Sequence, residues 1–231
     1  MPGFVTLLIR FGVTAMARRK PAHRTPGTKS PAPARSDSGT RGAGELRIIG
    51  GDWRSRKLKF PNAGGVRPTP ARTRETLFNW LAFHLAGSDC LDLFAGSGAL
   101  GLEALSRGAG HATLVDHTPA LANALRTNLR LLKSESGEVV CNTVEHYLAQ
   151  RQRPPFDIVF MDPPFRQGWL ERLFPLLEAQ GWVKPGGWVY VEHESELVTP
   201  AVPATWHLHR QKRAGQVTYS LFRVQAEGLS E

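Results

Sequence analysis

From Ser88 onward the sequence alternates short apolar runs with segments whose apolar residues recur at helical spacing. Such alternation predicts β-α units, in which a parallel sheet is covered by helices on both faces. The expected strands are residues 90–95, 111–116, 137–141, 156–162 and 186–194, and the expected helices are residues 99–108, 118–132, 144–151 and 168–181. Two further strand-like runs in residues 204–224 have no helix between them, which predicts an antiparallel pair at the end of the sheet.

The part of the chain before this alternation consists of two segments that differ in composition. Residues 1–44 are rich in Pro, Ser, Gly, Lys and Arg, so we expect them to form a disordered basic leader. Residues 45–87 are expected to form a hairpin and a helix, with Thr69 as the N-cap and Pro70 at the first helical position. The remaining segment, residues 88–226, is the expected α/β domain.

The net charge of +9 belongs to the front of the chain. The first 60 residues carry 13 Lys and Arg against 3 Asp and Glu, whereas the rest carry 16 against 17. This asymmetry indicates a polyanionic partner, either nucleic acid or a membrane surface, although a solubilising tail has the same composition. No apolar run approaches the roughly 20 residues that span a bilayer.

The cysteines and histidines place further limits on the chemistry. Only two cysteines occur, Cys90 and Cys141, and both lie in apolar runs, which predicts buried free thiols and favours the reducing cytoplasm. The eight histidines show no spacing typical of a metal site, so we expect no metal.

Three glycines, Gly96, Gly98 and Gly101, follow a G-x-G-x-x-G spacing between an expected strand and an expected helix. Glycines at such a junction let the backbone turn sharply and approach a ligand, although a tight turn without a ligand can look the same. In this strand–loop–helix context the spacing indicates a nucleotide-type cofactor.

Two carboxylates narrow the choice of cofactor. Asp92 lies four residues before Gly96, at the end of the strand, where a negative group suits a cationic or amine-bearing ligand better than a pyrophosphate. S-adenosylmethionine carries both a sulfonium and an amino group. Asp116 ends the next strand, where an acid can accept hydrogen bonds from both ribose hydroxyls. Asp116 could also cap the helix that follows, or do both.

The run FDIVFMDPPF places Asp162 at the end of another expected strand, at the same sheet edge as the other two acids. Pro163 and Pro164 fix the backbone and direct its carbonyl groups, and Phe165 offers a flat ring. These groups would form a receptor for a planar base with an exocyclic amine, with stacking worth about 1–3 kcal/mol. A rigid surface turn is the simpler alternative.

Several segments together carry a family resemblance. They are LDLFAGSGALGLEALSRGA, FMDPPF, LRIIGGDWRSRKLKFP, RPTPARTRETLFNWL and the tail HRQKRAGQVTYSLFR. From about Leu46 to Val224 the chain resembles the bacterial 16S ribosomal RNA guanine-N2 methyltransferase family. The resemblance implies a Rossmann-like class I fold that uses S-adenosyl-L-methionine, with a seven-stranded, mostly parallel sheet. It also implies methylation of the N2 amine of one guanine, guanine 966, in 16S rRNA of the assembled small ribosomal subunit.

The resemblance also implies roles for individual residues. The catalytic residues would be Asp162, Pro163, Pro164 and Phe165. The cofactor-binding residues would be Asp92, Phe94, Gly96, Gly98, Asp116 and Thr69, with Asn142 or Thr143 beside the adenine. The residues that face the RNA would be Arg47, Arg54, Arg56, Lys57, Arg67, Arg72 and Arg74. The family commonly has an acid or Asn beside the adenine, and the sequence CNTVEHYL leaves both candidates open.

Three other functions remain open from the residues alone. An adenine-N6 methyltransferase acting on DNA or RNA could use the same Asp-Pro-Pro-aromatic site. A non-catalytic RNA-binding assembly factor could keep the fold, although the intact motifs argue against it. A nucleotide-dependent dehydrogenase is disfavoured by Asp92. We expect a cytoplasmic monomer that binds no membrane.

Overall fold

The computed structural model describes residues 43–63, 66–150, 153–197 and 201–225, all within one compact unit, Gly39–Glu231. The expected leader, residues 1–44, lies almost wholly outside these residues. The strands are β1 (Gly44–Arg47), β2 (Lys57–Phe60), β3 (Asp89–Asp92), β4 (His111–Asp116), β5 (Gly137–Cys141), β6 (Phe156–Met161), β7 (Val183–Glu194), β8 (Trp206–Ala214) and β9 (Val217–Val224). The helices are α1 (Ala71–Trp80), α2 (Gly101–Ser106), α3 (Pro119–Leu132), α4 (Val144–Ala149) and α5 (Trp169–Ala179).

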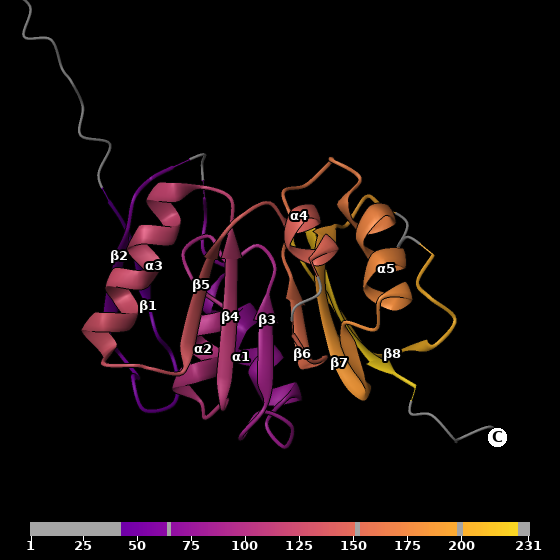
Figure 1. Cartoon of the computed structure of the whole chain (residues 1–231), viewed down its shortest axis with the longest axis horizontal. Helices are drawn as coiled ribbons and strands as arrows, with labels where there is room; N and C mark the ends of the chain where they lie inside the picture. Colours follow the sequence, from indigo (N-terminus) through magenta and orange to yellow (C-terminus); the bar gives the residue numbers. More distant parts are fainter. Residues whose placement is uncertain (1–42, 64–65, 151–152, 198–200, 226–231) are drawn as a thin grey trace, which may run out of the picture. The chain divides into compact units, whose positions relative to one another are not determined.

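The main sheet has seven strands in the order β5-β4-β3-β6-β7-β9-β8 (Figure 1). The five strands from β5 to β7 run parallel, and β9 is antiparallel to both β7 and β8. This confirms the expected seven-stranded, mostly parallel sheet with an antiparallel C-terminal pair. After β3 the chain adds β4 and β5 on one side of β3, and it then returns to add β6 on the other side. The strand order therefore reverses between β3 and β6. In open α/β sheets ligands bind at the carboxyl ends of the strands beside such a reversal.

The sheet is covered on both faces because successive side chains of each strand point to opposite sides. Cys90, Ile158 and Phe160 join the buried cluster that includes the apolar side chains of α1, α2 and α3. Their chain neighbours, Leu91 and Val159 among them, join a second cluster with α4 and α5. The three layers follow from central strands that bury apolar side chains on both faces.

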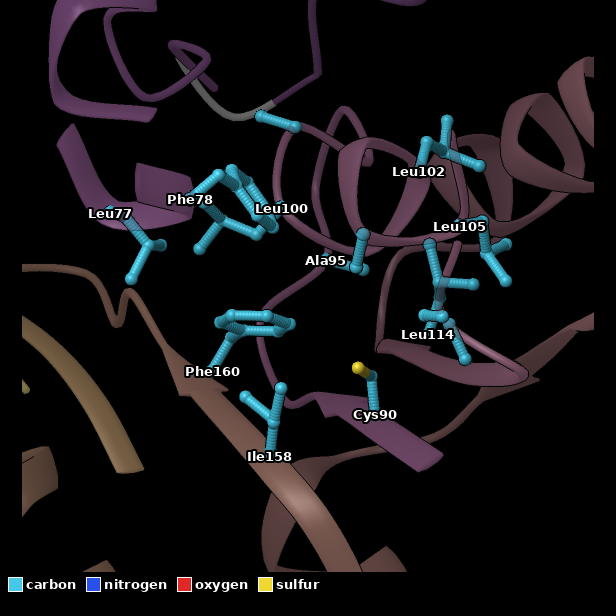
Figure 2. Close-up of a cluster of buried hydrophobic side chains, with 14 of the residues drawn as sticks. Leu77, Phe78, Cys90, Ala95, Leu100, Leu102, Leu105, Leu114, Ile158 and Phe160 are labelled. Atoms are coloured by element: carbon cyan, nitrogen blue, oxygen red, sulfur yellow. The ribbon is translucent and has the colours of Figure 1, made fainter. Parts of the chain in front are cut away.

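The N-terminal hairpin shares the first of these clusters with the sheet. Leu46 and Leu58, one from each hairpin strand, are buried in it. In the same cluster the rings of Phe78 from α1 and Phe160 from β6 lie 6.0 Å apart, as Figure 2 shows with the surrounding side chains. The division of the chain at residues 45–87 and 88–226 stays a prediction, but these two segments have a common apolar interior.

A buried ionic group ties the hairpin and α1 to α2. The Glu103 carboxylate accepts hydrogen bonds from the backbone N–H groups of Ile49 (3.0 Å) and Gly50 (2.8 Å). It also pairs with Arg74 at 3.0 Å and Arg107 at 2.8 Å. Glu103 and Arg74 are buried, so these bonds replace the hydration that both charges have lost.

Two local predictions were wrong. Thr69 is not the N-cap of α1, because the helix begins at Ala71 and Pro70 occupies the cap position without a side-chain bond. The Thr69 hydroxyl is directed elsewhere, as described below. Cys141, expected to be buried, is exposed at the end of β5, the outer strand on that side of the sheet, whereas Cys90 is buried.

Within the described ranges, none of the helices has the length and hydrophobicity of a membrane-spanning segment. The same part of the chain holds no group of three or more His, Cys, Asp or Glu side chains placed to bind a metal ion.

We predict that Arg74→Ala lowers the free energy of unfolding by about 3 kcal/mol, because it removes the more deeply buried of the two cationic partners of Glu103 and leaves Arg107 as the remaining one. The matched control is Arg72→Ala, since Arg72 is exposed on the same helix and its loss should change stability by less than about 0.5 kcal/mol. Urea denaturation monitored by tryptophan fluorescence measures both. Equal stability of the two variants would contradict the role of Arg74 in the interior.

Candidate active site

Three carboxylates meet at the carboxyl edge of the sheet. Asp92 is the last residue of β3, Asp116 is the last residue of β4, and Asp162 directly follows β6. These strands are neighbours, with β3 in the middle. The negative charges of Asp162 and Asp116 both act on the Asp92 carboxyl, so each of these acids lies within electrostatic range of Asp92.

The glycine-rich loop that follows β3 is fixed by its own packing and by one of these acids. Gly96 and Gly98 have φ angles of +50° and +84°, which side-chain-bearing residues rarely adopt. The Gly96 N–H donates to Asp116 Oδ2 at 2.9 Å. A Cβ on Gly98 would lie 2.6 Å from a methyl of Leu102, so a larger residue would have both a strained backbone and a neighbour to displace. The loop therefore keeps one shape beside the ends of β3 and β4.

Asp92 has an unusual environment. Its side chain is buried, and its Oδ2 accepts a hydrogen bond of 2.9 Å from the backbone N–H of Gly101. Its Oδ1 is buried and has no hydrogen bond of ordinary geometry, although the nearby backbone N–H of Phe94 acts to lower the pKa of the carboxyl. Burial raises the pKa of this carboxyl to about 7, and the neighbouring acids add to the effect. An unsatisfied carboxylate oxygen in such a place fits a ligand that carries an ammonium or sulfonium group.

Asp116 is bound to backbone on both of its oxygens. Besides the bond from Gly96, its Oδ1 accepts from the N–H of Thr118 at 2.7 Å, at the entry to α3. Each oxygen has a second lone pair, so ribose hydroxyls can still donate to it. The Asn142 backbone N–H donates to the Asp116 carbonyl at 3.2 Å, which brings the end of β5 to the same site.

The structure also separates the two candidates that the sequence left open at this position. The Thr143 hydroxyl accepts a hydrogen bond from the His146 N–H at 3.3 Å and thereby caps α4. The Asn142 side chain uses its carbonyl oxygen to accept from the Thr143 N–H at 2.9 Å, which leaves its amide N–H₂ group to donate to a base. We therefore favour Asn142 as the residue beside the adenine, which stays a prediction.

Asp162 is held by Thr69 from the N-terminal segment. The Thr69 hydroxyl donates to Asp162 Oδ2 at 3.1 Å. Burial raises the pKa of Asp162 to about 6, although the bond from Thr69 opposes the shift. Pro163 is buried and Phe165 keeps 38% of its surface exposed, so the carboxylate is fixed while the ring is free to contact a ligand.

Glu192 is a functional candidate that sequence reasoning missed. Met161 of β6 pairs with Val191 of β7, so the residues that follow them, Asp162 and Glu192, lie side by side. Glu192 is buried and accepts a hydrogen bond of 2.8 Å from the Tyr190 hydroxyl. Burial and the Asp162 charge raise its pKa to about 8. The signal was present, because Glu192 interrupts the apolar run WVYV just as Asp162 ends FDIVFM.

Trp169 at the start of α5 is a second residue that the sequence did not point to. Its indole lies edge-on to the ring of Phe94, with centroids 5.1 Å apart, and the Arg172 guanidinium lies 4.1 Å above it. A hollow of about 220 Å³ is bordered by Pro163, Pro164, Trp169 and His193. Aromatic and apolar groups thus continue outward from the Asp-Pro-Pro-Phe turn.

The N-terminal cations divide into two groups. Arg47, Arg54, Arg56, Lys57, Arg67 and Arg72 are exposed. Arg74 is buried, and it donates to the carbonyl oxygens of Thr69 and Arg47 as well as to Glu103. Contact of Arg74 with RNA therefore does not fit the structure, because no donor group of its side chain is directed to the surface. Its bond to Thr69 instead positions the residue that holds Asp162.

Comparison with known proteins identifies the family to which the chain belongs. The family model described as "Conserved hypothetical protein 95" matches residues 46–223. Ribosomal RNA small subunit methyltransferase D of Escherichia coli is 52% identical over 190 residues, which cover 82% of this chain and 96% of that protein. The chain belongs to the ribosomal RNA small subunit methyltransferase D family.

Other members of this family and their structures agree. The Haemophilus influenzae member is 46% identical over 185 residues, or 78% of this chain and 94% of that protein. A solved structure of a putative methyltransferase from Escherichia coli superimposes with a TM-score of 0.74 at 50% identity, covering 80% of this chain and all of that one. The expected Rossmann-like methyltransferase fold is confirmed.

We predict that Asp92→Asn stabilises the ligand-free protein by about 1–2 kcal/mol at pH 8, because it removes a buried charge. The folded-state pKa of about 7 lies above the unfolded value of 3.8, so the folded protein binds this proton more tightly. Stability therefore falls as pH rises through this window, and the penalty is complete only above pH 7. The difference between variant and parent should shrink as pH is lowered toward 4.

Denaturation of both proteins at several pH values measures this difference. Because Asp162 and Glu192 titrate in both proteins, only the part of their titration that depends on the Asp92 charge remains in the difference. A difference that does not change between pH 5 and pH 8 would contradict the raised pKa of Asp92.

Proposed function

We propose that this protein methylates ribosomal RNA with S-adenosyl-L-methionine as the methyl donor, and that its target is the N2 amine of guanine 966 in 16S rRNA of the small subunit. The observation that carries the proposal is the pairing of two sites at one sheet edge. The unsatisfied Asp92 oxygen suits a cationic cofactor, and the fixed Asp162 carboxylate beside exposed Phe165 suits an amine on a planar base. Membership of the family supports both halves.

The residues at the ends of β3, β4 and β5 fit the cofactor. Asp92 would accept a hydrogen bond from its amino group, Asp116 would accept from its ribose hydroxyls, and Asn142 would donate to its adenine. When bound, S-adenosylmethionine supplies a methyl group already activated by the sulfonium. The protein therefore needs no covalent nucleophile, and its task is to position the amine and to exclude water.

Asp162 and the residues around it fit the second task. The carboxylate would accept a hydrogen bond from the exocyclic amine, while Phe165 stacks on the base. Thr69 and the buried Pro163 keep the carboxylate in one orientation. The amine gives up a proton on methylation, and a carboxylate whose pKa is about 6 is placed to accept it. Because an amine of a paired base is not accessible, the target must be unpaired or flipped out.

Mass mapping of methylated nucleotides in rRNA tests the proposal. Ribosomal RNA from cells that lack the protein should have lost N2-methylation at guanine 966, and the plasmid-borne gene should restore it. Loss of an N6-methyladenine instead would show the alternative specificity, since the same acceptor groups can hold an adenine amine. Unchanged modification would exclude a methyltransferase role on rRNA.

We predict that Asp162→Ala lowers the rate of methyl transfer by at least about 100-fold while the affinity for S-adenosylmethionine changes less than threefold. The reason is that Asp162 contacts the amine and not the cofactor. Methylation of small subunits with radiolabelled cofactor and calorimetric titration of the cofactor measure the two quantities. Arg166→Ala, an exposed neighbour in the same turn, is the control. Equal turnover in Asp162→Ala and parent would remove Asp162 from the site.

The pH dependence of the reaction offers a separate prediction. Asp162 accepts hydrogen bonds from the amine only when it is ionised, so kcat/KM for rRNA should be level above pH 7 and fall tenfold per pH unit below about pH 6. The decline in kcat/KM begins near pH 6 because the pKa of Asp162 is raised. If Asp162 had the ordinary pKa of 3.8, the decline would begin only near pH 4. A level profile down to pH 5 would contradict it.

A further inference from the structure

Strand β8, at one edge of the sheet, has an exposed surface that is not part of the proposed active site. After Trp206 every residue of β8 is exposed. Its exposed ionisable side chains are all basic, and the sequence contains no Asp or Glu between Glu196 and Glu227. We define the cationic strip as Arg210, Lys212 and Arg213.

The cationic strip is not neutralised by the protein itself. Some exposed cations elsewhere pair with carboxylates, as Lys57 does with Glu45 and Arg172 does with Glu145. Others, such as Arg126 and Arg130 of α3, do not pair with any carboxylate in the described part of the chain. Of the ion pairs formed among the described residues, none includes a member of the strip. The only hydrogen bond from a cationic group of the strip that the structure shows is from Arg213 Nε to the Gly215 carbonyl, 3.1 Å away.

The pKa of His209, on the same strand, is affected by nearby positive charges. The pKa of His209 is lowered, first by partial burial and then by the charges of Arg210 and Arg223. Arg223 lies 4.6 Å above the Trp188 ring, and the His209 ring contacts the same indole at 5.0 Å. The charges of Arg210 and Arg223 therefore both lie near His209, on two neighbouring strands of the sheet.

Strand register places the strip in line with the proposed site. Lys212 pairs with Tyr219 of β9, and Tyr219 pairs with Glu192 of β7. Glu192 in turn lies beside Asp162, so the four residues form one row across β6, β7, β9 and β8. Three strand spacings of about 4.8 Å put the Lys212 backbone roughly 14 Å from that of Asp162.

The direction of β8 puts its charges at the correct edge. Both β7 and β8 are antiparallel to β9, so β8 runs the same way as the central strands. Its C-terminal half, which holds the cationic strip, therefore lies at the edge where Asp92, Asp116 and Asp162 converge. Had the strip occupied the N-terminal half, it would lie at the opposite edge of the sheet.

We propose that the cationic strip binds phosphates of the rRNA strand that carries the target base, and so holds the nucleotides next to the one bound at Asp162. This inference rests on the proposed function for its ligand. A base held at Asp162 leaves its flanking backbone within the 14 Å that separates the two sites, and phosphates are the partners that unpaired surface cations attract most strongly. Charges on an edge strand can also serve to prevent pairing with other sheets, but that role has no dependence on RNA.

The test compares two variants with the same change in net charge. The first is Arg210→Gln/Lys212→Gln/Arg213→Gln. The control is Arg126→Gln/Arg130→Gln/Lys133→Gln, which removes three exposed cations from α3 and the residue after it, packed at the other end of the sheet. Protein-free 16S rRNA and purified small subunits serve as ligands, with affinity measured at several salt concentrations. Thermal melting and calorimetry with S-adenosylmethionine verify that both variants are folded.

We expect the strip variant to bind protein-free rRNA at least tenfold more weakly than the parent, with the salt slope reduced by about 2 because three phosphate contacts are lost. KM for small subunits should rise while kcat changes less than twofold, and the control should lose less than threefold in affinity. In the parent, rRNA binding should raise the pKa of His209, followed by NMR, because phosphates offset the nearby arginines.

Three results would overturn the inference. They are an unchanged salt slope in the strip variant, an equal loss in the control variant, or a loss seen with small subunits but not with protein-free rRNA, which would assign the contact to a ribosomal protein. These outcomes are separate from failure of the proposed function. If the parent protein methylates no rRNA, the enzymatic proposal fails, whereas the binding measurements still decide whether β8 contacts RNA.

Discussion

The structure depends on the removal of several carboxylates from water at one edge of the sheet. Burial is the main cause of the raised pKa of three of these carboxyl groups, those of Asp92, Asp162 and Glu192. Each of them therefore resists ionisation in the absence of a ligand. A protein selected only for stability would place apolar residues at these strand ends. The arrangement makes sense as a site whose charges are compensated when a positively charged or amine-bearing molecule arrives.

The rest of the molecule can be understood as the support for that edge. The Glu103 carboxylate of α2 accepts hydrogen bonds from the N-terminal segment and pairs with Arg74 of α1. Arg74 in turn donates to the carbonyl oxygen of Thr69 and fixes its backbone. Thr69 then orients Asp162, which the chain places 93 residues later. Arg74, for which the family resemblance implied a contact with RNA, is thus part of the interior. The exposed cations of the same segment remain the candidates for contact with RNA.

Much of the fold could be predicted because the relevant signals are local. Apolar strands and amphipathic helices alternate clearly, and Asp92, Asp116 and Asp162 each stand where such a strand ends. The errors arose where tertiary contacts compete with local ones. Thr69 had the chemistry of a helix cap, but its hydroxyl bonds a distant carboxylate instead. Glu192 also follows an apolar run, but only the register between β6 and β7 shows that it lies beside Asp162.

The single hydroxyl of Thr69 has a consequence for the two acids beside it. It donates to Asp162 at 3.1 Å and also acts to lower the pKa of Glu192, yet it has only one hydrogen to give. Because that hydrogen is directed to Asp162, the Asp162 carboxyl is favoured as the anion. Glu192, whose pKa is raised to about 8, is the acid of the pair that keeps its proton at neutral pH. Two side chains of nearly the same chemistry are thereby made unequal by the direction of one O–H bond.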